Sequence, residues 1–179
     1  MPAMADQTEP SSTGLMKLLA FDAEDLAVVS AAFQDAIVRV ADMTFLPREQ
    51  RFALVAARFD WVAALRDRRE RCWAGLHFER VSDVKHIAVP QDDPAAMLNL
   101  LAIRFAPGDA PSGEISLTFS GGASIKLTVE CIEAQMRDTG PRWQTKSLPG
   151  HPIEDIPPEA AAPERNDEPE RPAGNGGPA

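Results

Sequence analysis

The chain has 179 residues, of which 44% are hydrophobic, so it can build one ordinary domain with a core but not two. Its formal net charge of -9 lies mostly at the two ends, which leaves residues 15–150 at about -2. Because phosphate neutralisation needs a basic surface, this balance argues against strong nonspecific binding to nucleic acid.

The chain shows no sign of export. No basic segment followed by an apolar stretch opens it, so no secretory signal is predicted. No run approaches the ~18 apolar residues of a membrane-spanning helix, so no transmembrane segment is predicted. The two cysteines, Cys72 and Cys131, lack a CxxC spacing and are predicted to be reduced, buried thiols. These features predict a cytoplasmic protein.

Composition divides the chain into three parts. Residues 1–14 are polar and are predicted to form a disordered arm. Residues 15–148 hold the apolar patterns and are predicted to form a single α+β domain. Residues 149–179 are rich in Pro, Glu, Ala and Gly, which cannot bury enough apolar surface to fold, so a disordered acidic Pro-rich tail is predicted.

The first half of the domain is predicted as a strand, a helix and a β-hairpin. Asp22 is a candidate N-cap, and apolar residues recur at helical spacing after it. The pattern then changes to that of strands, with a turn at 47–50. The predicted strand, helix and two hairpin strands cover 16–21, 23–34, 37–46 and 51–61.

The middle of the domain begins with a densely charged stretch, 62–71, predicted as a loop or a short helical connection. Strands are predicted after it at 72–80, 84–89 and 95–105. In the first of these, one face is apolar and the other carries polar residues and a tryptophan. The predicted apolar face consists of Cys72, Ala74, Leu76 and Phe78.

A second hairpin is predicted from strict alternation of apolar and polar residues over 115–119 and 125–129. A plain two-residue turn would place apolar residues opposite polar ones. An odd loop of Gly121, Gly122 and Ala123 is therefore predicted, which sets Phe119 opposite Ile125.

The domain is predicted to close with a short helix at 131–138. Ile132 and Met136 lie four residues apart, and Gly140 and Pro141 follow as helix-ending residues. The predicted fold class is α+β, a mostly antiparallel sheet of about seven strands with one N-terminal and one C-terminal helix. This count is that of a pleckstrin-homology-like half-barrel; a two-layer antiparallel sheet with the helices on one side is the alternative.

Several blocks together resemble a known family. They are LAVVSAAFQDAIVRVAD at 26–42, FLPREQRFALVAARFDW at 45–61, AGLHF at 74–78, LLAIRF at 100–105, and IEAQMRDTGP at 132–141 followed by Trp143. They resemble a family of small alphaproteobacterial proteins known only as a domain of unknown function, over about residues 16–148. The resemblance implies a bacterial, cytoplasmic protein, and it implies neither a reaction nor any site residues.

Motifs for catalysis or cofactor binding are missing from the sequence. His, Cys and carboxylate residues do not show metal-ligand spacing, since Cys72 and His77 point to opposite faces of one predicted strand. No G-x-S-x-G nucleophile elbow occurs. Gly121-Gly122 is not a phosphate-binding loop either, because no Lys follows it as such a loop requires. No metal site and no cofactor is predicted.

The densest basic cluster, residues 66–71, lies between Trp61 and Trp73. Arginine suits bidentate recognition of anionic groups, and Trp beside Arg is a composition favoured in interfaces. The cluster is also compatible with a solvated loop of internally paired charges. The leading hypothesis is a non-catalytic binding or adaptor module that contacts a protein partner, or an anionic ligand, through Trp61, Arg66, Arg68, Arg69, Arg71 and Trp73.

The alternative hypothesis is a small enzyme or metabolite-binding protein. His77 and Glu79 share the outward face of the strand predicted at 72–80 and could form an acid–base pair in a pocket on the sheet. A half-exposed structural histidine is the simpler interpretation. A homodimer that uses the arginine and tryptophan surface is a third possibility.

Overall fold

The computed structural model describes residues 14–146 and 148–149. The predictions of a disordered arm and a disordered tail fall, apart from Gly14 and Pro149, outside the described residues. No helix in the described part is long and apolar enough to cross a membrane.

The first half follows the predicted pattern. Strand β1 (Lys17–Ala20) leads into helix α1 (Ala23–Phe33), whose N-cap Asp22 accepts a hydrogen bond from the Asp25 backbone N–H at 2.8 Å. Strands β2 (Ala36–Leu46) and β3 (Arg51–Phe59) form the predicted hairpin. A single helical turn, α2 (Trp61–Ala64), follows, capped by Asp60, which accepts from the Ala63 N–H.

The second half of the described chain consists of strands. They are β4 (Glu70–Phe78), β5 (Val81–Ile87), β6 (Met97–Pro107), β7 (Gly113–Phe119), β8 (Ser124–Val129) and β9 (Ala134–Gln144). The predicted alternation in β4 is confirmed, because Cys72, Ala74, Leu76 and Phe78 are all buried.

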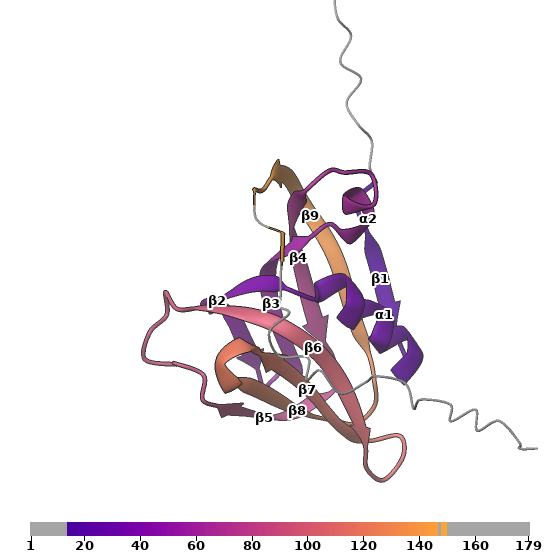
Figure 1. Cartoon of the computed structure of the whole chain (residues 1–179). Helices are drawn as coiled ribbons and strands as arrows, with labels where there is room; N and C mark the ends of the chain where they lie inside the picture. The colour runs from indigo at the N-terminus through magenta and orange to yellow at the C-terminus, as the bar shows by residue number, and fades with distance from the viewer. Residues whose placement is uncertain (1–13, 147, 150–179) are drawn as a thin grey trace, which may run out of the picture. The chain divides into compact units, whose positions relative to one another are not determined.

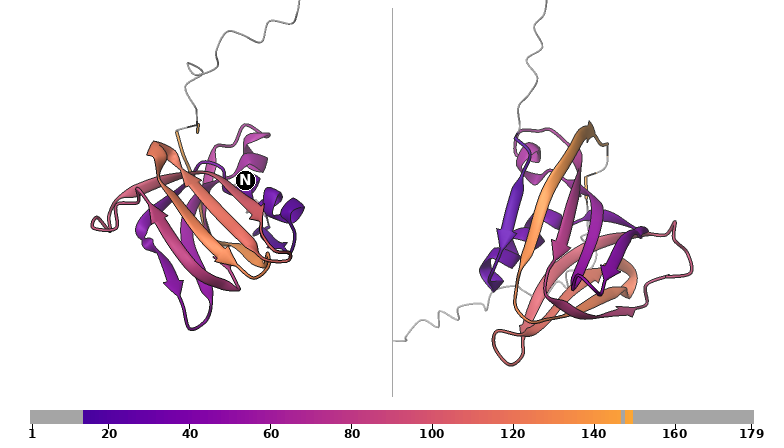
Figure 2. Two further views of the ribbon diagram at one scale, coloured as in Figure 1. Left: turned by 90° about the horizontal axis from the view of Figure 1, so that it is seen from below. Right: turned by 180° about the vertical axis from the view of Figure 1, so that it is seen from behind.

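All described strands join one antiparallel sheet of nine strands in the order β1-β9-β4-β3-β2-β6-β7-β8-β5. The sheet bends so that β6, β7 and β8 cross beneath β2, β3 and β4, and the core lies between these layers (Figure 1). Seen from behind, the indigo β1 lies beside the orange β9 at one edge (Figure 2). Helix α1 contacts β1, β3 and β6.

The α+β class with antiparallel pairing is confirmed, but the count of about seven strands, on which the half-barrel analogy was based, was wrong. The described sheet has nine strands instead of about seven, and it is not closed, since β1 and β5 remain as edges.

The predicted C-terminal helix at 131–138 was also wrong, because most of this segment belongs to β9. Ala134, Met136 and Asp138 are buried, with more exposed residues between them, which is the two-residue period of a strand. Strand β9 pairs with β4 on one side and β1 on the other, so its backbone groups find partners that a short helix would lack.

The β7–β8 hairpin has the predicted odd loop, shifted by one residue. The loop is Ser120–Gly122, with Gly121 and Gly122 both at positive φ, where glycine carries no Cβ clash. The Phe119 N–H donates to the Ala123 carbonyl, and Leu117, not Phe119, lies opposite Ile125. Apolar side chains still face one another, because a shift of two in register keeps the same face.

Candidate functional site

We call the face of the sheet that carries Trp73 the outer face, because it lies opposite the core. A groove crosses this face. It is a hollow of about 490 Å³. We call it the Trp73–Trp143 groove, and it is lined by Ile37, Arg39, Asp42, Ala57, Arg71, Trp73, Met97, Trp143 and Thr145.

The sheet register brings these residues together from five strands or strand ends. Ile37 on β2 lies opposite Ala57 on β3, which lies opposite Trp73 on β4. The rings of Trp73 and Trp143 contact each other with centroids 5.4 Å apart. Met97, at the start of β6, is 64% exposed and Trp73 is 39% exposed, so large apolar side chains face solvent here.

Arg71 lies in the groove but is mostly enclosed, with 8% of its surface exposed. One terminal nitrogen donates to the carbonyls of Asp35, at 3.2 Å, and Ala57, at 2.9 Å, and the guanidinium lies 5.9 Å from the Phe59 ring centroid. Burial lowers the pKa of Arg71 from its ordinary value, and the nearby Asp35 charge acts in the opposite direction.

The other charges of the groove are paired at its rim. Arg39 donates to both carboxylate oxygens of Asp42, at 3.0 and 2.8 Å, and this contact raises the pKa of Arg39. The groove therefore offers a mainly apolar, aromatic floor with charges that already have protein partners.

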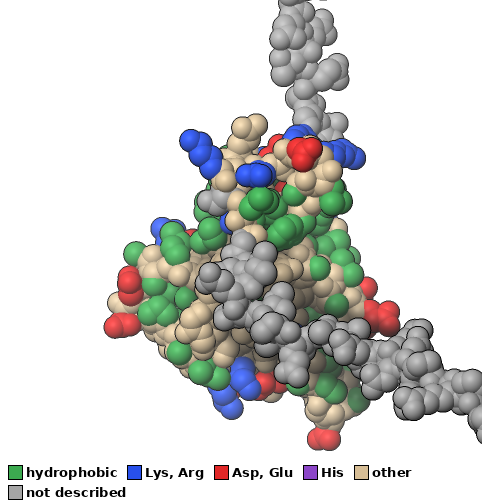
Figure 3. All heavy atoms as spheres, in the orientation of Figure 1, with side chains coloured by type: hydrophobic (Ala, Val, Ile, Leu, Met, Phe, Trp, Pro, Cys, Tyr) green, Lys and Arg blue, Asp and Glu red, His purple; other side chains and the backbone are tan. Residues whose placement is uncertain are grey.

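The predicted cluster does not form one surface. Arg71 and Trp73 line the groove, whereas Arg66, Arg68 and Arg69 do not. Arg68 lies 3.7 Å from Glu70. Basic side chains do gather at the end of the molecule that carries α2 and the last part of β9 (Figure 3).

Trp61 is also separated from Trp73. Its indole N–H donates to the Gln34 carbonyl at 3.3 Å, and its ring meets Phe59 edge-on. It lines another hollow, of about 260 Å³, together with Val62 and residues of β1 and α1. Trp61 is therefore not a groove residue.

The second predicted pair, His77 and Glu79, lies in a polar hollow of about 440 Å³ beside the β2–β3 turn. His77 Nε2 is 3.4 Å from Glu79 Oε1, and the same oxygen accepts from Arg51 Nε at 2.7 Å. The pair is thus brought together, with Arg51 as an additional partner of the carboxylate.

A buried ionic network behind the groove was not predicted. Arg58 Nε and Nη2 donate to the two carboxylate oxygens of Asp138 at 2.6 and 2.7 Å, and both side chains are buried. Arg142 contacts Asp138 and Asp60, and the Met16 N–H donates to Asp138 at 3.0 Å. The network ties β1, β3 and β9 to the start of α2.

Metal binding finds no support in this geometry. Among residues 14–146 and 148–149, no three His, Cys, Asp or Glu side chains gather closely enough to hold an ion.

Cys72 is buried against the network, and its pKa is raised, first by burial and then by the Asp138 charge.

The comparison with known families gives one match. A sequence profile of the family described as "Protein of unknown function (DUF2948)" matches residues 16–151, most of the chain. The chain belongs to this family. No curated protein and no solved structure matches the chain.

The resemblance predicted over residues 16–148 is therefore confirmed, while the alphaproteobacterial origin stays a prediction. The match covers every residue of the Trp73–Trp143 groove. Because the DUF2948 family has no described function, its members supply no activity to compare, and the site has to be judged by its own chemistry.

Of the groove residues, sequence reasoning named only Arg71 and Trp73, and the largest side chains that it missed are Trp143 and Met97. Trp143 was noted only as part of the resemblance, after a segment predicted to be helical. One signal was available: it is one of three tryptophans, and it follows Pro141 in a stretch with little else to bury.

Proposed function

We propose that this protein is a non-catalytic binding module whose contact surface is the Trp73–Trp143 groove. The observation that carries the proposal is the exposure of Met97 and Trp73 around a hollow of about 490 Å³. Exposed apolar surface of this kind, rimmed by polar groups, is typical of binding sites.

The composition of the groove supports a protein as the partner. Trp, Met and Arg are the residue types enriched in protein interfaces, and the groove has two tryptophans, one methionine and two arginines. Arg39 and Asp42 at the rim are paired with each other, so they are poorly placed to capture a free anion. Such charges can instead orient a protein partner and hydrogen-bond to it. The partner we expect presents an apolar side chain to the Trp73–Trp143 contact. A cytoplasmic setting remains part of this proposal.

The test is a capture experiment with the tagged full chain and two matched variants. Met97→Asp places a charge in the groove, and Leu65→Asp places the same charge at a site that is 87% exposed and outside the groove. The proposal expects a specific protein to be retained by the wild type and by Leu65→Asp and to be lost with Met97→Asp. The retained protein should then bind the purified chain directly.

Other outcomes decide against the proposal. Retention by Met97→Asp equal to that by the wild type would move the interface elsewhere. If the retained protein is the same chain, sedimentation should show a dimer that Met97→Asp dissociates, and the groove is then a homodimer interface. Charge reversal at Arg69, which lies outside the groove, should leave binding unchanged.

A small enzyme or metabolite-binding protein is the second candidate. The polar hollow of about 440 Å³ around His77 and Glu79 favours it. Glu79 Oε1 already accepts from Arg51 and lies 3.4 Å from His77 Nε2, so this oxygen is engaged within the protein. A ligand found by thermal-shift screening should no longer raise the melting temperature of His77→Ala but should still raise that of Lys85→Ala. Equal rises in both variants would exclude a site at His77.

A further inference from the structure

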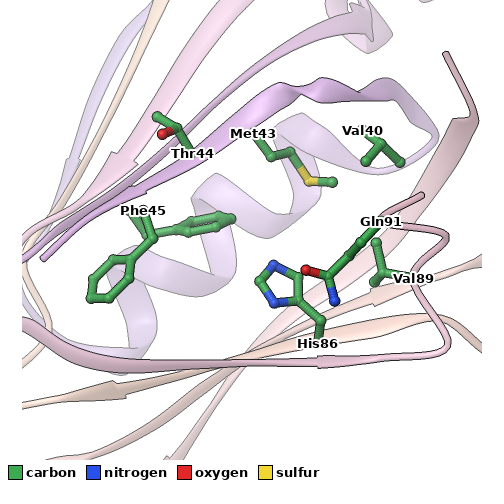
Figure 4. Close-up of a pocket in the computed structure, with 8 residues that line it drawn as sticks. Val40, Met43, Thr44, Phe45, His86, Val89 and Gln91 are labelled. Atoms are coloured by element: carbon green, nitrogen blue, oxygen red, sulfur yellow. The ribbon is translucent and has the colours of Figure 1, made fainter. Parts of the chain in front are cut away.

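A fourth hollow, of about 270 Å³, lies where the last half of β2 faces β5 and the chain that follows it (Figure 4). We call it the His86 hollow. It is lined by Val40, Met43, Thr44, Phe45, Phe52, His86, Val89 and Gln91, and it shares no residue with the Trp73–Trp143 groove.

Its lining is partly polar and partly apolar, and the apolar part is already in place. Phe52 is fully buried, and Val40, Met43, Phe45 and Val89 are partly buried and packed against the core. Figure 4 shows Met43 across the hollow from His86, with Phe45 at one end and Val40 and Val89 at the other. A wall held by the core does not have to rearrange to receive a ligand, so less ordering free energy opposes binding.

Two polar side chains, both exposed to solvent, lie on one side of the hollow. The His86 imidazole and the Gln91 amide lie next to each other in Figure 4. Within the part of the chain that the structure describes, neither side chain makes a hydrogen bond or ion pair; Gln91 only donates its backbone N–H to Val89. Together they offer a donor and an acceptor to a ligand.

No Lys, Arg, Asp or Glu lines the hollow. A charged head group would therefore gain no opposite charge here, and a neutral group that both donates and accepts is the better fit. Two phenylalanines and the Met43 thioether provide the kind of surface that aromatic rings contact well.

We propose that the His86 hollow binds a small, neutral aromatic molecule whose single hydroxyl or amide group hydrogen-bonds to His86 and Gln91. The ring lies among Phe45, Phe52 and Met43, and the polar group points to β5. The volume is near the lower end of the ~300–1,000 Å³ usual for ligand sites, so the ligand has about one ring.

Phenol is the probe for the first experiment. It is titrated into the full chain while the methyl signals of Met43, Val40 and Val89 are followed by NMR. Phenol should shift these signals in a saturable way. Toluene, which has the same ring and no hydroxyl group, should bind about three- to ten-fold more weakly, the factor that corresponds to one neutral hydrogen bond.

Two exposed neighbours on β5 supply matched variants. His86→Ala should weaken phenol binding about three- to ten-fold and leave toluene binding nearly unchanged, whereas Lys85→Ala, which does not line the hollow, should change neither. Val89→Trp should fill the space and abolish both. If this variant does not fold, the pair on β5 still decides the question.

Three results would overturn the inference. Phenol could leave the three methyl signals unmoved, it could bind no better than toluene, or His86→Ala could weaken both probes equally. None of these results touches the Trp73–Trp143 groove, so the two sites are tested independently.

Discussion

On the inner face of the sheet near α2, Arg58, Asp138 and Arg142 interlock with Asp60, and their charges are satisfied by one another. On the outer face of the sheet, Trp73 on β4 and Met97 at the start of β6 remain exposed although their strands pair with β9 and β2. The inner arrangement pairs its four charges within the chain and leaves the Arg142 Nε as a buried nitrogen without a hydrogen-bond partner among the described residues, whereas the outer one leaves apolar surface in water. The difference supports our proposal that the groove serves binding, whereas removal of one partner from the buried network should destabilise the fold.

The first way to break this comparison is to remove Asp138. Asp138→Ala leaves Arg58 buried without a carboxylate, and we expect a loss of about 3–5 kcal/mol in the free energy of unfolding, measured with urea. Asp42→Ala removes the partner of the exposed Arg39 at the surface and should cost far less stability.

The double variant Arg58→Met with Asp138→Leu sharpens the same test. It replaces the buried pair by apolar side chains, so most of the lost stability should return. Equal losses for Asp138→Ala and Asp42→Ala would show that the buried network does not hold β3 and β9 together.

Arg71 stands between the two regions, because it is enclosed like the network but lines the groove. Arg71→Met leaves the carbonyls of Asp35 and Ala57 without this donor, and we expect a loss of about 1–3 kcal/mol. Arg69→Met, an exposed neighbour, should stay within about 0.5 kcal/mol of the wild type. Indistinguishable values would mean that water replaces Arg71 at both carbonyls.

Local patterns explain which elements could be predicted. The β2–β3 hairpin, the faces of β4 and the parity of the β7–β8 loop depend on neighbours in sequence, and they were predicted. Strand β9 was mistaken for a helix because Ile132 and Met136 have helical spacing. Its true state depends on β1 and β4, which lie far away in the chain.

The same reason separates the predicted from the missed site residues. Arg71 and Trp73 were grouped as part of a basic cluster flanked by tryptophans, and they share a face because both lie on β4, two residues apart. Trp143 and Met97 reach the groove only through the order of the sheet, which no local pattern contains. Trp61 was grouped with Trp73 by proximity in sequence, but the chain turns into α2 between β3 and β4 and carries it away.

The third prediction concerns Cys72, buried beside the network. Its thiol pKa is raised in the folded chain, while the unfolded chain releases the proton at the ordinary value of about 8.5. The unfolded state therefore binds fewer protons above that pH, and stability falls as pH rises, by at most about 1.4 kcal/mol per pH unit. The wild type and Cys131→Ala should both show this fall of the free energy of unfolding with pH. Cys72→Ala should lack it. Parallel slopes for Cys72→Ala and the wild type would contradict the assignment.

The smallest expected effect on stability is the most informative about function. Met97→Asp changes a side chain that is 64% exposed, so the free energy of unfolding should move by less than about 0.5 kcal/mol, as for Leu65→Asp. The same substitution should abolish partner retention, because a charge in an apolar contact has to be desolvated without a compensating partner. Stability and binding would then respond to opposite faces of one sheet. A large loss of stability with Met97→Asp would instead make the groove part of the folding core, and the comparison between the two faces would fail.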